Sequence, residues 1–342
     1  MTGAAAESRC YRQPVAALPR LRIVAVAAVV GVFATSAVAC DAGSPQTPPA
    51  PATTTSAGTQ QPSSSRAATR PTKPATTPTT ASARPTRTQA ARVNANDKRF
   101  NKKNFGAPTG ALNPWLPLIP GTQSLRDGSL FRGSRKLRHQ RRLTVTDVVK
   151  TVNGIRTVIV LDQDIDAGQI GETALDYLAQ DKHGNVWYLG SYTEIYEGGQ
   201  FVNAVDAWLA GTNEANPGVL MMADPREGLK YVEARTGRET IRAEVAKIGG
   251  RKCVPFRCFP KTLTVLEDGD EFKYYAQGVG HIATEPNYSG GEQEKEAVVN
   301  VIRLTPKGLA EASAEALRID RHARTAAKSV FGDSAQAQRA KS

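Results

Sequence analysis

Three aspartates occupy alternate positions in one short stretch, at Asp162, Asp164 and Asp166. Together with Gly168 they resemble the start of an EF-hand loop, whose alternating carboxylates bind calcium. That loop requires glycine where Ala167 stands, an acidic residue where Thr173 stands and two flanking helices, whereas the surrounding residues favour strands. We therefore interpret the aspartates as the water-facing side of a hairpin, with a calcium loop as the alternative, and predict no metal site.

The densest basic run of the chain lies just ahead of these aspartates. Its charges could bind a phosphate-bearing partner, such as an anionic lipid or a wall polymer. On a strand the same charges alternate between two faces and protect an exposed edge against aggregation, which is the interpretation we favour. The run comprises Arg132, Arg135, Lys136, Arg138, His139, Arg141 and Arg142.

Five aromatic residues gather on two adjacent predicted strands. Ligand pockets are lined mostly by aromatic and aliphatic side chains, so these residues are candidates for an apolar binding site. Packing in the protein core is the alternative and the commoner use of such residues. They are Trp187, Tyr188, Tyr192, Tyr196 and Trp208.

The sequence contains no G-x-S-x-G, H-E-x-x-H, P-loop or S-x-x-K motif, so we predict no catalytic residue and no cofactor. His183 and His322 fall in a predicted turn and a predicted terminal helix. His281 follows Gly-Val-Gly at the start of a strand and is the one histidine that we would consider for catalysis. A structural role for His281 is the favoured interpretation.

Cysteine placement indicates export. Arg20 and Arg22 precede an apolar run over residues 23–39, which is typical of a secretory signal, and Ala37-Val38-Ala39-Cys40 resembles the bacterial lipobox. We predict a lipid on Cys40 and a protein anchored to the outer face of the cell membrane. Cleavage without lipidation and an uncleaved signal anchor are the alternatives. All three place the rest of the chain outside the cell, where nucleic acid is not an expected partner.

Cys253 and Cys258 remain after export, at the two ends of CVPFRC. A pair of cysteines in an oxidising compartment predicts a disulfide. Two free thiols, or half of a metal site, are the alternatives.

Residues 41–95 are rich in Pro, Thr, Ser and Ala and contain almost nothing to bury, so we predict a disordered linker. The formal charge of +12 divides into +3 before Cys40, +5 in this linker and +4 in the remainder, so the basicity is not a nucleic-acid signature. The linker is either a bare spacer or a substrate for O-glycosylation. Candidate acceptors are Thr53, Thr54, Thr55, Thr76, Thr77, Thr79 and Thr80.

The remaining residues predict a mainly β domain over 96–305. About ten alternating runs are joined by short turns, among them Asn153-Gly154, which favours a hairpin. We expect an antiparallel meander that forms a curved sheet, a partly open barrel or a sandwich. Thr305-Pro306 predicts the start of one C-terminal helix over 306–331, followed by a disordered tail over 332–342.

Five stretches between residues 113 and 317 carry a resemblance to a known family: NPWLPLIPGT, AQDKHGNVWYLGSYTEIYEGG, NPGVLMMADPREG, YYAQGVGHI and LTPKGLAEASAEAL. They resemble secreted or lipid-anchored proteins of actinobacteria. The resemblance implies a β-rich extracytoplasmic domain and implies no activity or catalytic residues.

These observations together predict a surface-tethered, non-catalytic domain that binds a lipid or a cell-envelope component in the concave face of its sheet. Two alternatives stay open. An extracytoplasmic hydrolase would show His281 converging with carboxylates in a cleft. An adaptor for a partner protein would show a flat, exposed apolar patch.

Overall fold

A computed structural model describes residues 100–106, 113–132, 134–288 and 292–341 of the protein. The predicted signal, the lipidation site Cys40, the linker and its threonines lie outside the described residues. Within the described residues, no helix combines the length and the apolarity that crossing a membrane requires.

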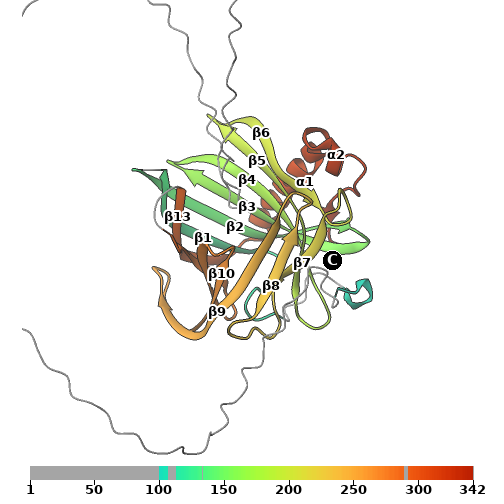
Figure 1. The fold of residues 1–342 in the computed structure, drawn as a ribbon. Coiled ribbons are helices and arrows are strands. Elements are labelled where there is room, and N and C mark those ends of the chain that lie inside the picture. The colour runs from blue at the N-terminus through green and yellow to red at the C-terminus, as the bar shows by residue number, and fades with distance from the viewer. Residues whose placement is uncertain (1–99, 107–112, 133, 289–291, 342) are drawn as a thin grey trace, which may run out of the picture. The chain divides into compact units, whose positions relative to one another are not determined.

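The domain is mainly β, and its central feature is an antiparallel, barrel-like sheet of twelve strands (Figure 1). Around the barrel the strands follow the order β1, β13, β12, β11, β10, β9, β8, β7, β5, β4, β3, β2, and β2 pairs again with β1. The strands are β1 (Thr122–Arg132), β2 (Arg135–Val152), β3 (Ile155–Asp166), β4 (Gln169–Gln180), β5 (Val186–Glu197), β7 (Asn216–Met221), β8 (Lys230–Arg235), β9 (Thr240–Cys253), β10 (Cys258–Glu267), β11 (Glu271–Ala276), β12 (Gly280–Pro286) and β13 (Glu292–Arg303).

Four short elements are added to this barrel. Strand β6 (Gln200–Leu209) pairs only with β5, beside the part of β5 that β7 does not cover. A 3-10 turn (Lys102–Asn104) precedes the barrel, and α2 (Lys328–Phe331) and β14 (Gln338–Arg339) follow the long helix α1 (Pro306–Ala326). The predicted meander and C-terminal helix are therefore present, and the sheet closes as a barrel.

Tight turns join strands that are consecutive in the sequence, so these strands pair with each other in the sheet. Asn153 and Gly154 both have positive φ angles, 50° and 77°, as the Asn-Gly hairpin predicted from the sequence requires. Ala167 and Gly168 repeat the same arrangement at 51° and 87°. These two turns set the register of β2, β3 and β4, and hence which side chains point into the barrel.

Helix α1 covers the outer face of the sheet on β2, β3, β4 and β6. Thr305 caps its first turn by accepting a hydrogen bond from the Gly308 amide. Its apolar side buries Ala316, Ile319 and Ala323. Both faces of β3 and β5 are consequently buried, one under the helix and the other inside the barrel.

A buried polar contact fastens the helix to the sheet. Lys150 on β2 donates a hydrogen bond of 2.8 Å to Asp320 on α1, and the Tyr177 hydroxyl donates to the same carboxylate oxygen at 2.9 Å. The two charged side chains are 0% and 2% exposed. Burial lowers the pKa of Lys150, although the neighbouring Asp320 opposes that change. The contact therefore depends on each partner neutralising the other.

The prediction of a disordered tail is wrong for residues 332–341. Strand β14 pairs with Val148 and Val149 of β2, and the Ala340 amide donates to the Asp147 carbonyl at 2.7 Å. Arg339 also forms an ion pair with the Asp147 carboxylate. The tail pairs with the part of β2 that β1 does not cover. The composition of the tail alone does not indicate this partner.

One end of the barrel is crossed by the segment 113–121. The Asn113 side chain donates to the Gly184 carbonyl at 2.8 Å and to the Met222 carbonyl at 3.2 Å, and the Gly278 amide donates to the Pro114 carbonyl. Leu118 is 1% exposed within the same core. The segment thus contacts turns from three separate strand pairs and closes this end with apolar side chains.

Cys253 and Cys258 form a disulfide bond in the hairpin between β9 and β10. Their residues are direct partners in the β9–β10 register, which brings the two side chains together. The hairpin tip packs on a small second apolar cluster that includes Val254, Phe259 and Ile282.

Replacing Asp320 by alanine should lower the free energy of unfolding by about 3 to 5 kcal/mol, because it leaves the Lys150 ammonium buried without a counter-charge. Urea denaturation of the full-length protein measures this change. Lys307→Ala at the exposed start of α1 is the control and should change stability by less than about 0.5 kcal/mol. Equal effects of the two substitutions would contradict the role given to Asp320.

Candidate functional site

Charged side chains line the barrel interior where β13, β1, β2, β3 and β4 lie side by side. Acidic residues on β13, β3 and β4 flank basic residues on β1 and β2. We call this group the inner charge cluster; it comprises Glu294 and Glu296 on β13, Arg126 on β1, His139 and Arg141 on β2, Asp162 and Asp164 on β3, and Glu172 on β4.

Strand alternation explains how one cluster forms from several strands. Residues two apart on a strand share a face, so Asp162 and Asp164 project together, as do Glu294 and Glu296. Asp162 and Asp164 are 4% and 6% exposed, and Glu296 is 2% exposed. Apart from Arg141, whose side chain is 23% exposed, the members of the cluster are ionisable groups that are almost completely removed from water.

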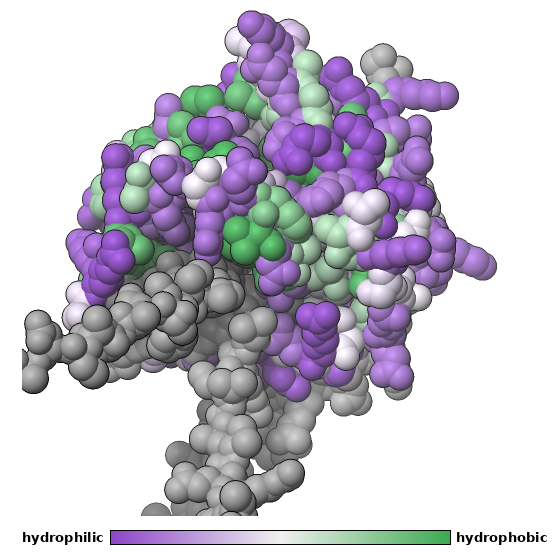
Figure 2. Space-filling view, turned by 90° about the horizontal axis from the view of Figure 1, so that it is seen from above, coloured by the Kyte–Doolittle hydropathy of each residue, from purple (hydrophilic) through white to green (hydrophobic). Residues whose placement is uncertain are grey.

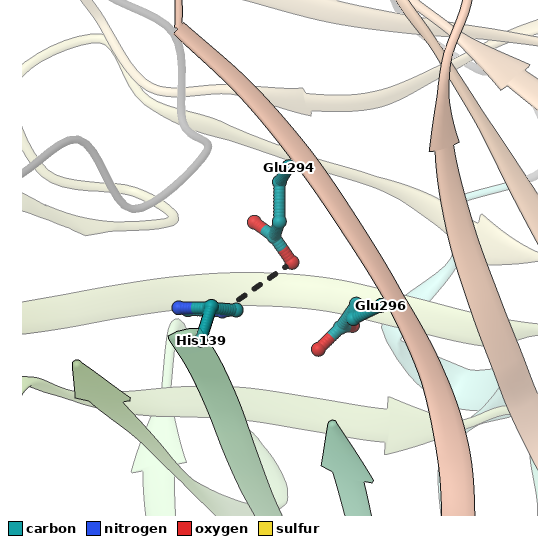
Figure 3. A group of neighbouring side chains, drawn as sticks. All are labelled: His139, Glu294 and Glu296. Carbon is teal, nitrogen blue, oxygen red and sulfur yellow. Dashed lines mark ion pairs between the residues drawn. The ribbon is translucent and has the colours of Figure 1, made fainter. Parts of the chain in front are cut away.

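Gly128 lies between two members of the cluster. It pairs with Glu296 on one side and with His139 on the other, so all three share one row across the sheet. A Cβ atom built at Gly128 would lie 1.9 Å from the Lys295 carbonyl oxygen. The glycine allows β1 and β13 to approach closely, and His139 faces the two glutamates across it (Figure 3).

Two arginines hold most of the carboxylates in place. Arg141 bonds both oxygens of Asp162 and lies 3.4 Å from Asp164. Arg126 donates to Glu296 Oε1 at 2.8 Å and to the His281 carbonyl at 3.2 Å. Arg141 Nη1 also approaches Glu294 at 3.6 Å and Glu296 at 3.8 Å. The Arg141 guanidinium thus bridges carboxylates of β3 and β13, whereas Arg126 joins Glu296 of β13 to the backbone of β12.

His139 is held by a carboxylate at one ring nitrogen. Its Nδ1 lies 2.8 Å from Asp166 Oδ1, whereas its Nε2 lies 3.7 Å from Glu294 Oε1, beyond hydrogen-bonding distance. Burial lowers the pKa of His139, but the bond to Asp166 and the charges of Glu294 and Asp164 outweigh it and raise the pKa to about 9. His139 is therefore an imidazolium near neutral pH when only protons are available.

Burial and neighbouring charges shift the pKa values of Glu294, Asp164, Glu172 and Glu296. Burial and the neighbouring Glu296 raise the pKa of Glu294 to about 8. Burial raises the pKa of Asp164 to about 7 against the attraction of Arg141, and it raises that of Glu172 well above its usual value. Burial also disfavours the charge on Glu296, but Arg126 and Arg141 prevail and lower its pKa. These directions show that two guanidinium groups cannot neutralise all of the carboxylates.

Several buried polar atoms in the cluster have no hydrogen-bond partner among the described residues. Buried polar atoms in native proteins nearly always have a partner, so a concentration of exceptions calls for an explanation. The atoms are His139 Nε2, Glu294 Oε1, Glu296 Oε2, Asp164 Oδ1, Glu172 Oε2 and Arg126 Nε.

A second charged group faces the first across the interior. Lys273 on β11 donates to both oxygens of Glu267 on β10, at 2.7 and 2.8 Å, and lies 3.4 Å from Glu271. Burial and the charge of Glu267 raise the pKa of Glu233 well above its usual value. The pKa of Glu271, raised chiefly by burial, is lowered in part by Arg141 of the inner charge cluster. The two groups therefore share one electrostatic environment.

The structure corrects the interpretation of the aspartate run. Asp162 and Asp164 do not face water, because closure of the barrel turns this face of β3 inward against Arg141. The alternation itself is as predicted, and strands flank the run. Asp166 lies at the turn into β4 and contacts His139.

The basic run also differs from its favoured interpretation. Strand β2 is no edge, since it pairs with β1 on one side and β3 on the other. The charges do alternate between faces: the Arg138 side chain is 65% exposed and bonds Asp127, whereas His139 and Arg141 enter the inner charge cluster. The exposed half of the run comprises Arg135, Lys136 and Arg138.

The five aromatic residues do not line one pocket. Trp187 packs against Phe100 and Phe105, and Tyr192 packs against Phe331 of α2. Tyr188 and Trp208 contact each other with ring centroids 5.1 Å apart, and the Tyr188 hydroxyl donates to Asp176 at 2.5 Å. Tyr196 bonds the buried Glu194 beneath α1. Packing within the protein accounts for these side chains.

His281 does not converge with carboxylates. Its Nε2 lies 2.8 Å from the Ala283 carbonyl and 3.2 Å from the Thr284 hydroxyl. Burial and the positive charge of Arg126 lower its pKa well below 6.5, so it is neutral. His183 lies in the turn after β4, and His322 on α1 bonds Glu194 at 2.6 Å.

Sequence reasoning missed the carboxylates of β13 that share Arg141 with Asp162 and Asp164. The stretch EQEKEAVV places Glu294 and Glu296 two residues apart, the same alternation that made the aspartates noticeable. That spacing was a usable signal. The proximity of these glutamates to His139 could not be predicted, because β2 and β13 are distant in sequence and meet only through β1.

Compared with protein-family models, with curated proteins and with solved structures, the chain gives no match.

A carboxyl group at the edge of this interior gives a pH-dependent prediction. Burial and Asp162 raise the pKa of Asp176 to about 6, against the bonds that it accepts from Tyr188 and Ser191. Between about pH 4 and 6 the folded protein therefore holds a proton that the unfolded chain has lost, so this group reduces stability as pH rises.

Asp176→Asn keeps an acceptor oxygen for Tyr188 and removes the charge. We compare the free energy of unfolding of the variant with that of the wild type by urea denaturation at pH 4 and at pH 7.5. The difference in favour of the variant should be about 2 kcal/mol larger at pH 7.5 than at pH 4. An identical difference at the two pH values would contradict the burial of an ionised Asp176.

Proposed function

We propose that the protein is a lipid-anchored, extracytoplasmic binding protein whose barrel interior holds a small, polar, positively charged ligand. The observation that carries this proposal is the excess of buried carboxyl groups over buried cations, together with buried polar atoms that have no partner among the described residues.

The charge balance supports a cationic ligand. Three permanent cations, Arg126, Arg141 and Lys273, share the interior with His139. Nine carboxyl groups oppose them: Asp162, Asp164, Glu172, Asp176, Glu233, Glu267, Glu271, Glu294 and Glu296. Burying unpaired carboxylates is costly, and either protons or a bound cation can relieve the repulsion. A cation that relieves it binds favourably.

A polar ligand suits this interior better than the lipid considered from the sequence. The aromatic residues that would have lined an apolar pocket are packed against one another, α2 and the N-terminal phenylalanines. An acyl chain has no charged or hydrogen-bonding group, so it could not pair with the charges of the inner charge cluster. We therefore propose a polar component of the cell envelope or its surroundings as the ligand class.

The hydrolase alternative has one feature in its favour, the His139–Asp166 pair, which resembles the orientation of a general base. A general base must be unprotonated, however, and the surrounding carboxylates raise the pKa of His139 to about 9 despite its burial. This environment favours binding over proton abstraction.

The surface is less suited to a protein adaptor. Four large apolar side chains are exposed among the described residues, Ile170, Phe201, Val202 and Val299. On the face seen in Figure 2, polar residues surround the smaller apolar areas. Isolated exposed apolar residues are ordinary on soluble proteins.

Native mass spectrometry of the full-length protein, purified from the organism that encodes it, tests the binding proposal. We expect an additional mass that denaturation releases, and we expect Glu172→Gln to reduce its occupancy by at least about tenfold, because the charge removed faces the interior. Glu194→Gln is the matched control, since Glu194 is equally buried but lies under α1. Apoprotein alone in the wild type would overturn the proposal.

The proposed anchor has a separate test. Cys40→Ala should move the protein from the membrane fraction to the medium, because two or more acyl chains are needed to hold a protein stably at a bilayer. Immunoblots of both fractions measure the distribution. Unchanged retention in the membrane would favour an uncleaved signal anchor and contradict lipidation.

A further inference from the structure

We propose that His139, Glu294 and Glu296 form a binding site for one divalent transition-metal ion, of the type represented by Zn²⁺ and Mn²⁺. This inference rests on the proposed function and names the cation that the interior takes. It assigns a specific role to three residues on two strands, β2 and β13.

The geometry brings three ligand atoms together. One atom from each residue lies within 4.8 Å of the other two, and all three residues are buried. Figure 3 shows the imidazole and both carboxylates directed toward the same space. An ion near the centre of such a triangle could reach all three atoms after a small movement of the side chains, since metal–ligand distances are about 2.0 to 2.2 Å.

A second observation points independently to a ligand. Each of the three residues has one buried side-chain atom without a hydrogen-bond partner among the described residues: His139 Nε2, Glu294 Oε1 and Glu296 Oε2. The two carboxylate oxygens accept when they are ionised, and Nε2 accepts once it has lost its proton while Nδ1 keeps its own. A metal ion that displaces these protons would supply the partner that all three residues lack among the described residues.

The surroundings of His139 match those of a metal ligand. A histidine that binds a metal usually donates its other ring N–H to a carboxylate, which fixes the tautomer and the ring orientation. Asp166 occupies that place, 2.8 Å from Nδ1. The contact directs the lone pair of Nε2 toward Glu294 and Glu296.

The two arginines nearby are compatible with the site. Arg126 donates to Glu296 Oε1 and leaves Oε2 without a partner, while Arg141 is engaged mainly by Asp162. Counted with Asp162, Asp164 and Glu172, the cluster holds five carboxyl groups against these two guanidiniums. A divalent ion reduces the remaining negative charge, and ion binding replaces protons that otherwise occupy the same groups.

The ligand types select the class of ion. One imidazole with two carboxylates suits Zn²⁺, Mn²⁺ or Fe²⁺, whereas Ca²⁺ and Mg²⁺ favour oxygen ligands alone. The site therefore differs from the calcium loop considered for Asp162, Asp164 and Asp166, which uses none of the same residues.

Isothermal titration calorimetry of the chelator-treated, full-length protein in detergent tests the proposal, with ZnCl₂ and MnCl₂ as probes. We expect one ion per chain for the wild type. His139→Gln and Glu294→Gln should each weaken binding by at least about 100-fold, and Asp166→Asn by about tenfold. His322→Gln is the matched control, because His322 also pairs with a buried carboxylate but lies on the outer face, and it should bind as the wild type does.

Circular dichroism without metal establishes whether each variant is folded. Should the variants unfold, proton NMR of the Co²⁺-loaded wild type provides the second measurement. One solvent-exchangeable, strongly shifted imidazole N–H is expected, because Asp166 holds the Nδ1 proton. Absence of that signal would overturn the site.

The remaining outcomes separate this inference from the proposed function. Wild-type protein that binds neither ion, or full affinity in both His139→Gln and Glu294→Gln, overturns the metal site. A copurified organic cation found by native mass spectrometry would then leave the binding proposal standing. Loss of metal binding in His322→Gln would place the ion elsewhere and also refute the assignment.

Discussion

The structure depends on the pairing of Arg141 with carboxylates inside a closed barrel. Arg141 on β2 bonds Asp162 and lies near Asp164, both on β3. It also lies near Glu294 and Glu296 on β13, so one guanidinium interacts with acidic groups from strands on both sides of it in the sheet. Buried ions require partners, and arginine can serve several through its five donors. Because β13 reaches β2 only through β1, the arrangement exists only when the strands are in register. Gly128 supports that register, since a side chain there would collide with β13.

The two faces of the sheet serve different purposes. On the outside, α1 is fastened by apolar contacts and one neutralised pair, Lys150 with Asp320, whose atoms all find partners. On the inside, six polar atoms of the inner charge cluster have no hydrogen-bond partner in the part of the chain that the structure describes. A fully satisfied buried network stabilises a fold, whereas a partly satisfied one is expensive unless something else completes it. This contrast within one molecule is the reason for assigning binding to the interior and a structural role to the helix contact.

The interior also gives a physical account of how a cation and protons compete. Burial raises the pKa values of Glu294 and Asp164 to about 8 and 7, and neighbouring carboxylates add to the effect. The fold therefore places these carboxyl groups where their ionised forms are unfavourable. Protonation relieves the repulsion without fixing geometry. A cation relieves it and orders the side chains around itself. At the opposite end of the barrel Asn113, Trp115 and Leu118 are buried instead.

The sequence alone determined the class of the fold, because local patterns decide it: alternating runs, the Asn153-Gly154 turn and the Thr305-Pro306 helix start all have counterparts in the structure. It also determined that Asp162 and Asp164 share a face, since strand periodicity is a local property. Only the tertiary structure decided which face became the interior. Because β1 pairs with β2 and closes the barrel, charged side chains that we expected on the water-facing side point inward. Strand β14 pairs with β2, which lies far from it in the sequence. Pairing between distant strands depends on the register of every strand between them, and no local pattern contains that information.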